Sequence, residues 1–208
     1  MNLRLFPTFV LTAALSLSPM LAAAADANGA QSFVQAQQNK LTGIVKQGSN
    51  AQLSAAMDAM IDYDALAQRT FGNPCAKGVS LCQNHWNELS AAQRTEVTGL
   101  LKKLVVKNYQ KNLKRTLDYD ISFKSSQEQG HDFRVRTSAK SRVKPREAPY
   151  SIDYIVTESG GALHVVDIVT EGSSLVKNYY EQFHKMLGTP NQGYPYIVKK
   201  LNEKLAKP

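Results

Sequence analysis

Apolar positions in the first half of the chain recur three and four residues apart, a spacing that places them on one face of a helix. The pattern predicts helices over residues 32–47, 53–71 and 90–117, the second with a break near Asp62. Gly48 follows the first of these segments, where a glycine is a common stop signal. Each segment is therefore expected to contribute one apolar face to a shared core.

After Leu117 the period changes from 3.6 to 2, and this alternation of apolar and polar residues indicates β-strands. Gly160-Gly161 separates the last two alternating segments and is a strong signal for a tight hairpin turn. The expected strands cover residues 119–125, 131–140, 149–158 and 162–170.

Helical spacing returns after the last strand, over residues 174–187 and 194–204. Helices, then antiparallel strands, then helices again indicate an α+β fold. Both faces of the segment 162–170 are largely apolar, so this strand is expected to be covered on both sides. We therefore predict a curved antiparallel sheet of four to five strands, wrapped by helices that enclose an apolar cavity.

Residues 1–25 have the three-part order of a secretory signal peptide: a positive side chain, an apolar stretch, and then small residues. The apolar stretch is shorter than the roughly 20 residues that a membrane span requires. We expect cleavage after Ala24 or Ala25, a flexible new start over residues 26–31, and one exported domain over residues 26–208.

The chain has two cysteines, Cys75 and Cys82, with six residues between them. In an oxidising compartment this spacing favours a disulfide within a short loop, residues 73–84. Closing so small a loop is expected to stabilise the fold by roughly 2–3 kcal/mol. Metal or redox chemistry is the alternative, but zinc needs two further ligands and the four histidines show no paired spacing. We therefore expect no metal site.

Composition narrows the class of protein and the kind of partner. The 208 residues are 43% hydrophobic and 20% charged, which excludes a disordered chain and matches one domain. Lys and Arg total 25 against 17 Asp and Glu, a formal charge of +8, which favours nucleic acid, anionic lipid or an acidic protein as partner. Without its leader the chain has 183 residues and a charge of +7. Export makes nucleic acid the weakest of the three alternatives.

The predicted helix over 90–117 begins with Ser90 and Gln93, which are spaced as a capping box. The side opposite its apolar face is basic, which describes either a solvated surface or a docking stripe for an acidic partner or anionic headgroups. A second basic cluster lies within residues 134–146. The basic side chains of the helix are Lys102, Lys103, Lys107, Lys111, Lys114 and Arg115.

The sequence contains no nucleophile elbow, zinc-protease, phosphate-loop or dinucleotide motif. Asp167 and Glu171 are the candidate catalytic carboxylates, because they lie at the end of an apolar strand. A buried aspartate there can serve as a general base. Alternatively, it accepts backbone N–H bonds at the start of the next helix and holds the corner. His164 and His184 have no obvious serine or cysteine partner.

The segment 163–183 combines a strand ending in Val-x-Asp, then Glu-Gly-x-Ser, then a helix with Asn-Tyr and Gln-Phe. Upstream, Phe71-Gly72, Trp86 and the run Ser90-Ala-Ala-Gln-Arg precede the long helix. Together these motifs resemble the MlaC, or toluene-tolerance, family of periplasmic phospholipid-binding proteins. The resemblance covers about residues 32–205 and assigns a motif role, as a structural corner near the pocket, to Asp167, Glu171, Gly172 and Ser174.

Two features depart from the family pattern. Leu163 occupies a position where the family usually has tryptophan, a change that affects the expected cavity wall. Residues 73–85, which contain both cysteines, separate a glycine and a tryptophan that are normally close. This second change adds a surface loop that can alter how a partner docks.

The resemblance implies a periplasmic carrier that binds phospholipid tails in an apolar pocket and makes or breaks no bond, with no cofactor. It also implies two partners: an inner-membrane ABC transporter with an MCE-domain protein, and an outer-membrane lipoprotein or porin complex. From periodicity and alternation we predict the lipid-contacting side chains, although the same pattern also describes an ordinary packed core. These residues are Leu101, Leu104, Val105, Tyr109, Val135, Ile152, Tyr154, Val156, Val165 and Ile168.

Three alternatives remain open from the sequence. The hydrophobic ligand can be another lipid, such as a hopanoid or a sterol. The protein can be a small α+β enzyme that uses Asp167. The basic clusters can instead belong to a module that binds an anionic polymer, in which case binding would depend steeply on salt.

Overall fold

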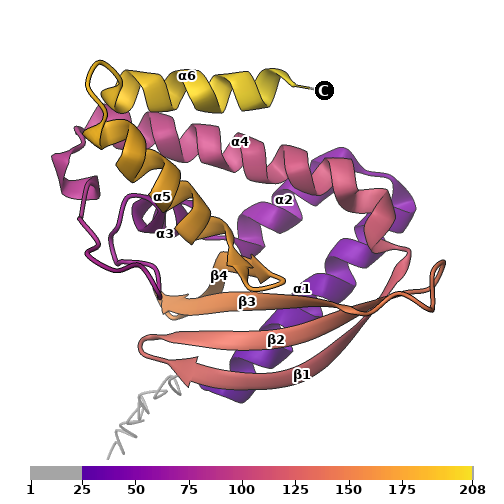
Figure 1. The fold of residues 1–208 in the computed structure, drawn as a ribbon. Helices are drawn as coiled ribbons and strands as arrows, with labels where there is room; N and C mark the ends of the chain where they lie inside the picture. The colour runs from indigo at the N-terminus through magenta and orange to yellow at the C-terminus, as the bar shows by residue number, and fades with distance from the viewer. Residues whose placement is uncertain (1–24, 208) are drawn as a thin grey trace, which may run out of the picture.

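The computed structural model describes residues 25–207, apart from the side chains of residues 112–116. The predicted signal peptide, residues 1–25, therefore lies outside the described residues except for Ala25. Within that range the fold is α+β, as the sequence predicts (Figure 1). Its helices are α1 (Ala27–Gln47), α2 (Asn50–Met60), α3 (Tyr63–Thr70), the 3-10 turn η1 (Trp86–Glu88), α4 (Ala91–Thr116), α5 (Leu175–Gly188) and α6 (Gly193–Ala206).

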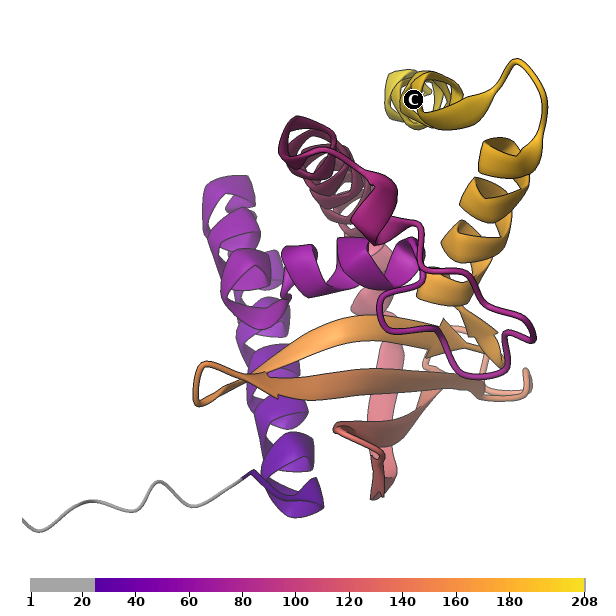
Figure 2. The same cartoon turned by 90° about the vertical axis from the view of Figure 1, so that its left-hand side faces the viewer.

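The strands form one sheet in the order β1-β2-β3-β4-β5, with every neighbouring pair antiparallel. This agrees with the predicted four to five strands, and the Gly160-Gly161 hairpin joins β3 to β4. Figure 2 shows that the sheet is strongly twisted. The strands are β1 (Tyr119–Gln129), β2 (Asp132–Ser141), β3 (Tyr150–Ser159), β4 (Ala162–Thr170) and the short β5 (Ser173–Ser174).

The prediction of a flexible segment over residues 26–31 is wrong. Helix α1 begins at Ala27, because the Asp26 carboxylate accepts a hydrogen bond from the Gly29 N–H at 2.6 Å. An aspartate in this position satisfies one of the free N–H groups of the first turn, which stabilises a helix start. Helix α1 is therefore 21 residues long and includes more of the chain's beginning than its apolar spacing suggested.

Two other predicted helix boundaries follow from similar caps. The expected break near Asp62 separates α2 from α3, and the Asp62 carboxylate accepts the Ala65 N–H at 2.8 Å. At the start of α4, the Ser90 N–H donates to Gln93 Oε1 at 2.9 Å and the Gln93 N–H donates to Ser90 Oγ at 3.2 Å. This reciprocal pair is the capping box that the sequence predicts.

The helices are unevenly distributed around the sheet. Helix α1 crosses the strands and contacts β1 and β2, whereas α4, α5 and α6 lie together above the sheet (Figures 1 and 2). Helix α6 packs on α4 and α5, and α3 lies between α4, α5 and β4. One apolar core results, formed by these helices and one face of the sheet.

Candidate functional site

The ten residues predicted to contact lipid all lie in this apolar core. Their α4 members and their strand members belong to one connected cluster, although no sequence pattern relates the two groups. Leu101, Leu104, Val135, Tyr154, Val156 and Val165 are buried, and Val105, Tyr109, Ile152 and Ile168 are partly buried against them. The structure thus places these side chains together, and their contact with a lipid stays a prediction.

A β-bulge brings two of the predicted residues onto the same face. Opposite Tyr154 stands Ile168, and opposite Val156 stands Val165, although two and not one residue separate Ile168 from Val165 on β4. The extra residue is Val166, which has no partner in β3 at this register shift. Because paired residues share a face, the bulge turns both Val165 and Ile168 toward the apolar core.

The core also contains a polar contact that the sequence did not suggest. The Gln38 side-chain amide of α1 donates a hydrogen bond to the hydroxyl of Tyr154 on β3. Burial raises the pKa of Tyr109 to about 12, and burial, reinforced by the nearby Tyr109, raises the pKa of Tyr154 further. Both phenols therefore stay protonated at neutral pH. The weak periodicity of α1 carried no signal that Gln38 would face the sheet.

Asp167 lies near the end of β4, and both oxygens of its carboxylate accept hydrogen bonds at the corner that leads into α5. The oxygen Oδ1 accepts the N–H of Ile168 at 2.8 Å and the N–H of Val176 at 3.0 Å. The oxygen Oδ2 accepts the Ser174 hydroxyl at 2.6 Å. Burial raises the pKa of Asp167, and these three hydrogen bonds oppose that rise. The geometry is that of a carboxylate that holds a helix start.

The other motif residues complete the same corner. The Ser174 hydroxyl oxygen accepts the Lys177 N–H at 2.9 Å and so caps α5. The Glu171 carboxylate accepts the N–H of Ser151 on β3, and the Glu171 N–H donates to the Ser151 carbonyl at 3.0 Å. Glu171 and Gly172 both have a positive φ, of 50° and 77°. The motif therefore turns the chain sharply and ties that turn to the neighbouring strand.

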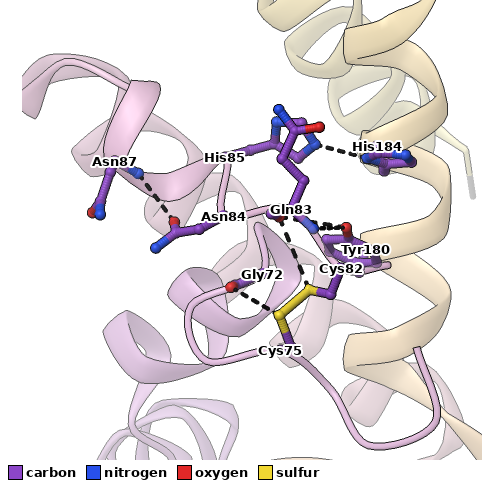
Figure 3. The surroundings of a disulfide bond; sticks show 9 residues. All are labelled: Gly72, Cys75, Cys82, Gln83, Asn84, His85, Asn87, Tyr180 and His184. Carbon is purple, nitrogen blue, oxygen red and sulfur yellow. Dashed lines mark hydrogen bonds between the residues drawn. A yellow bond between two sulfur atoms is a disulfide. The ribbon is translucent and has the colours of Figure 1, made fainter. Parts of the chain in front are cut away.

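Cys75 and Cys82 form the predicted disulfide, with their Cα atoms 6.0 Å apart (Figure 3). The loop that it closes is attached to α5, because the hydroxyl of Tyr180 accepts the Gln83 N–H at 2.8 Å. Gly72 begins the loop at φ 83°, and a Cβ there would lie 2.3 Å from the Gln83 carbonyl oxygen. The two ends of the loop therefore touch, and the disulfide stabilises that closed shape.

A pair of histidines forms a further contact between this region and α5. His85 is buried, and its Nε2 lies 2.8 Å from Nδ1 of His184 on α5 (Figure 3). The ring of Tyr180 is stacked near that of His184, with 5.5 Å between the ring centroids. On its other side His85 Nδ1 lies 3.2 Å from the Glu88 carboxylate. The sequence showed no pairing of these histidines, because 98 residues separate them.

The predicted lysine face of α4 is partly occupied by the protein itself. The ammonium group of Lys102 pairs with Asp58 of α2 at 2.8 Å. The ammonium group of Lys107 donates to the carbonyl of Leu205 at 2.7 Å and also to the carbonyl of Lys207. These lysines therefore attach α4 to α2 and to the end of α6. The side chains of Lys114 and Arg115 lie outside the described residues.

A surface hollow of about 300 Å³ lies between α3 and the β3–β4 hairpin. Its lining is mostly polar, includes Asp62, Arg69 and Glu158, and shares no residue with the predicted lipid contacts. The predicted contacts instead pack against one another in the core. The apolar cavity expected from the sequence is therefore not shown, and it stays a prediction.

Leu163, at the position where tryptophan was expected, is partly buried against the same core. Between residues 25 and 207, no three or more His, Cys, Asp and Glu side chains are placed to hold a metal ion. In that part of the chain no helix combines the length and the apolar character that a bilayer span needs.

Comparison with known proteins places the fold in a family. The structure of a phospholipid-binding protein from Ralstonia solanacearum, solved in complex with a phospholipid, is similar to this chain at a TM-score of 0.68. The two share 20% sequence identity over 88% of this chain and 98% of that one. Among curated protein sequences none matches at a significant level. The family model described as MlaC protein matches residues 27–203, and this chain therefore belongs to the MlaC family.

Proposed function

We propose that the protein is a phospholipid carrier that holds acyl tails between helices α1 and α4 and the apolar face of the sheet. The observation that carries this proposal is the gathering of α4 and strand side chains into one apolar core, in a chain of the MlaC family. The phospholipid complex of the Ralstonia solanacearum protein, which shares this fold, supports the same choice of ligand. The proposed activity is binding, with no covalent step.

The energetics explain why such a carrier needs a large apolar interior. Each buried CH2 group contributes about 0.8 kcal/mol, so one sixteen-carbon tail represents on the order of 12 kcal/mol of transfer free energy. The protein avoids the cost of exposing the tail to water only if it encloses the tail while the lipid crosses the aqueous space. Because the predicted contacts pack against one another, we expect α1 and α4 to move away from the sheet when a tail enters.

The route of the carrier is part of the proposal. We expect export by the predicted signal peptide, and shuttling in the periplasm between an ABC transporter with an MCE-domain protein and an outer-membrane complex. N-terminal sequencing of the protein from cells tests export, with Ala25 or Asp26 expected as the first residue. Cleavage after Ala24 would leave the new amine at Ala25, whose nitrogen lies 3.2 Å from the Glu158 carboxylate. Cross-linking in intact cells, followed by identification of the captured proteins, tests the two partners.

Extraction of the purified mature protein with organic solvent, followed by mass spectrometry, tests the ligand. We expect phospholipid at a stoichiometric level and uptake of phospholipid from liposomes. A hopanoid or a sterol in the extract would instead identify the alternative ligand. No lipid in the extract, together with no uptake, would contradict the proposed function.

Two matched variants test the location of the tails. Ile168 faces the apolar core from β4, whereas Ile155 stands opposite Asp167 on the other face of the sheet, and both are partly buried. We expect Ile168→Trp to reduce bound phospholipid, because the larger side chain fills the space that the tails need. Ile155→Trp should keep the wild-type amount. Equal lipid content in two folded variants would show that the tails lie elsewhere.

A further inference from the structure

The connection between β2 and β3, residues 142–149, is the second feature of this molecule that points to a ligand. Every residue in it is exposed, and Figure 1 shows it extending beyond the sheet, at the end where α4 leads into β1. We call residues 140–150 the β2–β3 loop. It shares no residue with the apolar core or with the Asp167 corner.

The β2–β3 loop is strongly basic. It carries four cations, Lys140, Arg142, Lys144 and Arg146, and one acid, Glu147. Arg142 pairs with Asp120 of β1 at 3.0 Å, and Lys144 pairs with Glu147 at 2.9 Å. Within the described residues, Lys140 and Arg146 have no ion-pair partner. Two full positive charges are therefore available to an outside ligand.

The same loop exposes apolar surface. Among the described residues three large apolar side chains are exposed, and two of them, Val143 at 66% and Tyr150 at 43%, belong to this loop. The Tyr150 ring meets the ring of Tyr119 edge to face, with 5.9 Å between the centroids. A tyrosine in this position offers both an apolar ring and a polar hydroxyl, a combination enriched at membrane interfaces.

Hydrogen bonds donated by backbone N–H groups hold the loop in shape. The Lys144 N–H donates to the Ser141 hydroxyl at 3.0 Å, and the Glu147 N–H donates to the Lys144 carbonyl at 3.1 Å. At the base of the loop, the Arg142 N–H donates to the Asp118 carbonyl at 2.7 Å. An ordered loop loses less conformational entropy when it binds, so its exposed groups are prepared for contact.

We propose that the β2–β3 loop docks the protein on a membrane surface that carries anionic lipid headgroups. Lys140 and Arg146 would contact the headgroups, while Val143 and Tyr150 would enter the interface between headgroups and tails. An acidic protein surface would satisfy the cations, but the two exposed apolar side chains in the same loop favour a lipid surface. The inference extends the proposed function, since a carrier that shuttles lipid between complexes in two membranes works next to bilayer surfaces.

Flotation with lipid vesicles tests the docking surface on the full mature protein. The probes are vesicles of phosphatidylcholine alone and vesicles of phosphatidylcholine mixed with phosphatidylglycerol. Each cation near an anionic surface contributes about fivefold to binding, so Lys140→Gln combined with Arg146→Gln should weaken binding to the anionic vesicles about 25-fold. Val143→Ser should also weaken it. Added salt should weaken wild-type binding through screening.

The matched control removes the same charge elsewhere. Lys185 on α5 and Lys199 on α6 are exposed, and Figure 1 shows these two helices above the sheet, away from the loop. Lys185→Gln combined with Lys199→Gln should leave vesicle binding within about twofold of wild type, because charges beyond a Debye length act weakly. All the replaced side chains are exposed, so thermal unfolding should be unchanged.

The outcomes separate docking from lipid carriage. Equal losses in the loop and control variants would overturn the proposal, as would equal wild-type binding to neutral and anionic vesicles. If Lys140→Gln combined with Arg146→Gln lost binding to an acidic protein but kept vesicle binding, the loop would belong to a protein partner instead. Lipid extraction from the same samples is read separately: loop-dependent vesicle binding by a protein that contains no lipid would sustain the docking surface while contradicting the carrier.

Discussion

Replacement of Asp167 distinguishes a structural carboxylate from a catalytic one. In Asp167→Ala the N–H groups of Ile168 and Val176 lose their acceptor, and the Ser174 hydroxyl loses its own. Each buried hydrogen-bonding group left without a partner lowers the free energy of unfolding by about 1–3 kcal/mol. Removing the buried charge of Asp167 offsets part of that loss. We therefore expect Asp167→Ala to lower the free energy of unfolding by about 2–4 kcal/mol.

Asp167→Asn should be milder, because both backbone N–H groups donate to the same oxygen, Oδ1. The amide oxygen can replace Oδ1, and only the Ser174 hydroxyl then faces a donor in place of an acceptor. We expect a loss of about 1 kcal/mol at neutral pH. Urea unfolding followed by circular dichroism measures both variants, and lipid extraction should find wild-type phospholipid in the folded asparagine variant.

The pH dependence follows from the raised pKa of Asp167 in the folded protein. Because the folded state then holds this proton more tightly than the unfolded state, the group contributes most stability below its unfolded pKa of about 3.9. That contribution is lost as the pH rises through the folded pKa. Asparagine has no such proton, so the destabilisation of Asp167→Asn should grow as the pH falls from 7 toward 4. A penalty that shrinks on acidification, or an alanine variant as stable as wild type, would refute this reasoning.

Three further tests concern the disulfide loop and the core. Replacing both cysteines by serine should lower the free energy of unfolding by about 2–3 kcal/mol, the loop-closure value, as measured by urea unfolding. Tyr154→Phe leaves the Gln38 amide without its acceptor and should cost about 1–2 kcal/mol in the same assay. Gly72→Ala places a Cβ 2.3 Å from the Gln83 carbonyl oxygen and should lower the melting temperature far more than Gly160→Ala, which meets open space at a similar positive φ.

Each of these expectations can fail in a defined way. Wild-type stability after loss of the disulfide would mean that the contacts to α5 hold the loop by themselves. An unchanged stability for Tyr154→Phe would mean that the amide of Gln38 finds another acceptor. Equal effects of the two glycine substitutions would show that backbone conformation, and not the close approach to Gln83, sets the cost.

Local patterns were sufficient for most of the secondary structure. Hydrophobic periodicity, turn residues and helix caps all depend on residues that are close together in the chain. The α4 capping box, the Gly160-Gly161 hairpin and the break at Asp62 could therefore be predicted. The short cap at Asp26 was missed because no apolar repeat follows it closely. The disulfide was predictable for the same local reason, since its cysteines are only seven positions apart.

The sequence could predict which residues belong to the candidate site, but not how they contact one another. The motif residues carried a resemblance, and the structure adds that Asp167 holds the start of α5 through three hydrogen bonds. Contacts between distant segments had no sequence signal, since a single chain shows no pairing between positions far apart. The Gln38 contact with Tyr154 and the meeting of His85 with His184 are of this kind.

The sequence was enough to predict the order of elements, the α+β class and the motifs that resemble one family, because each depends on residues close together in the chain. It was also enough for the basic charge, which is a sum over all residues. The tertiary structure alone decided which apolar residues share a face. Strict alternation would have placed Val165 and Ile168 on opposite faces of β4, and the extra residue Val166 reverses one of them. Register between strands is set by packing over the whole sheet, so no local pattern could have revealed it.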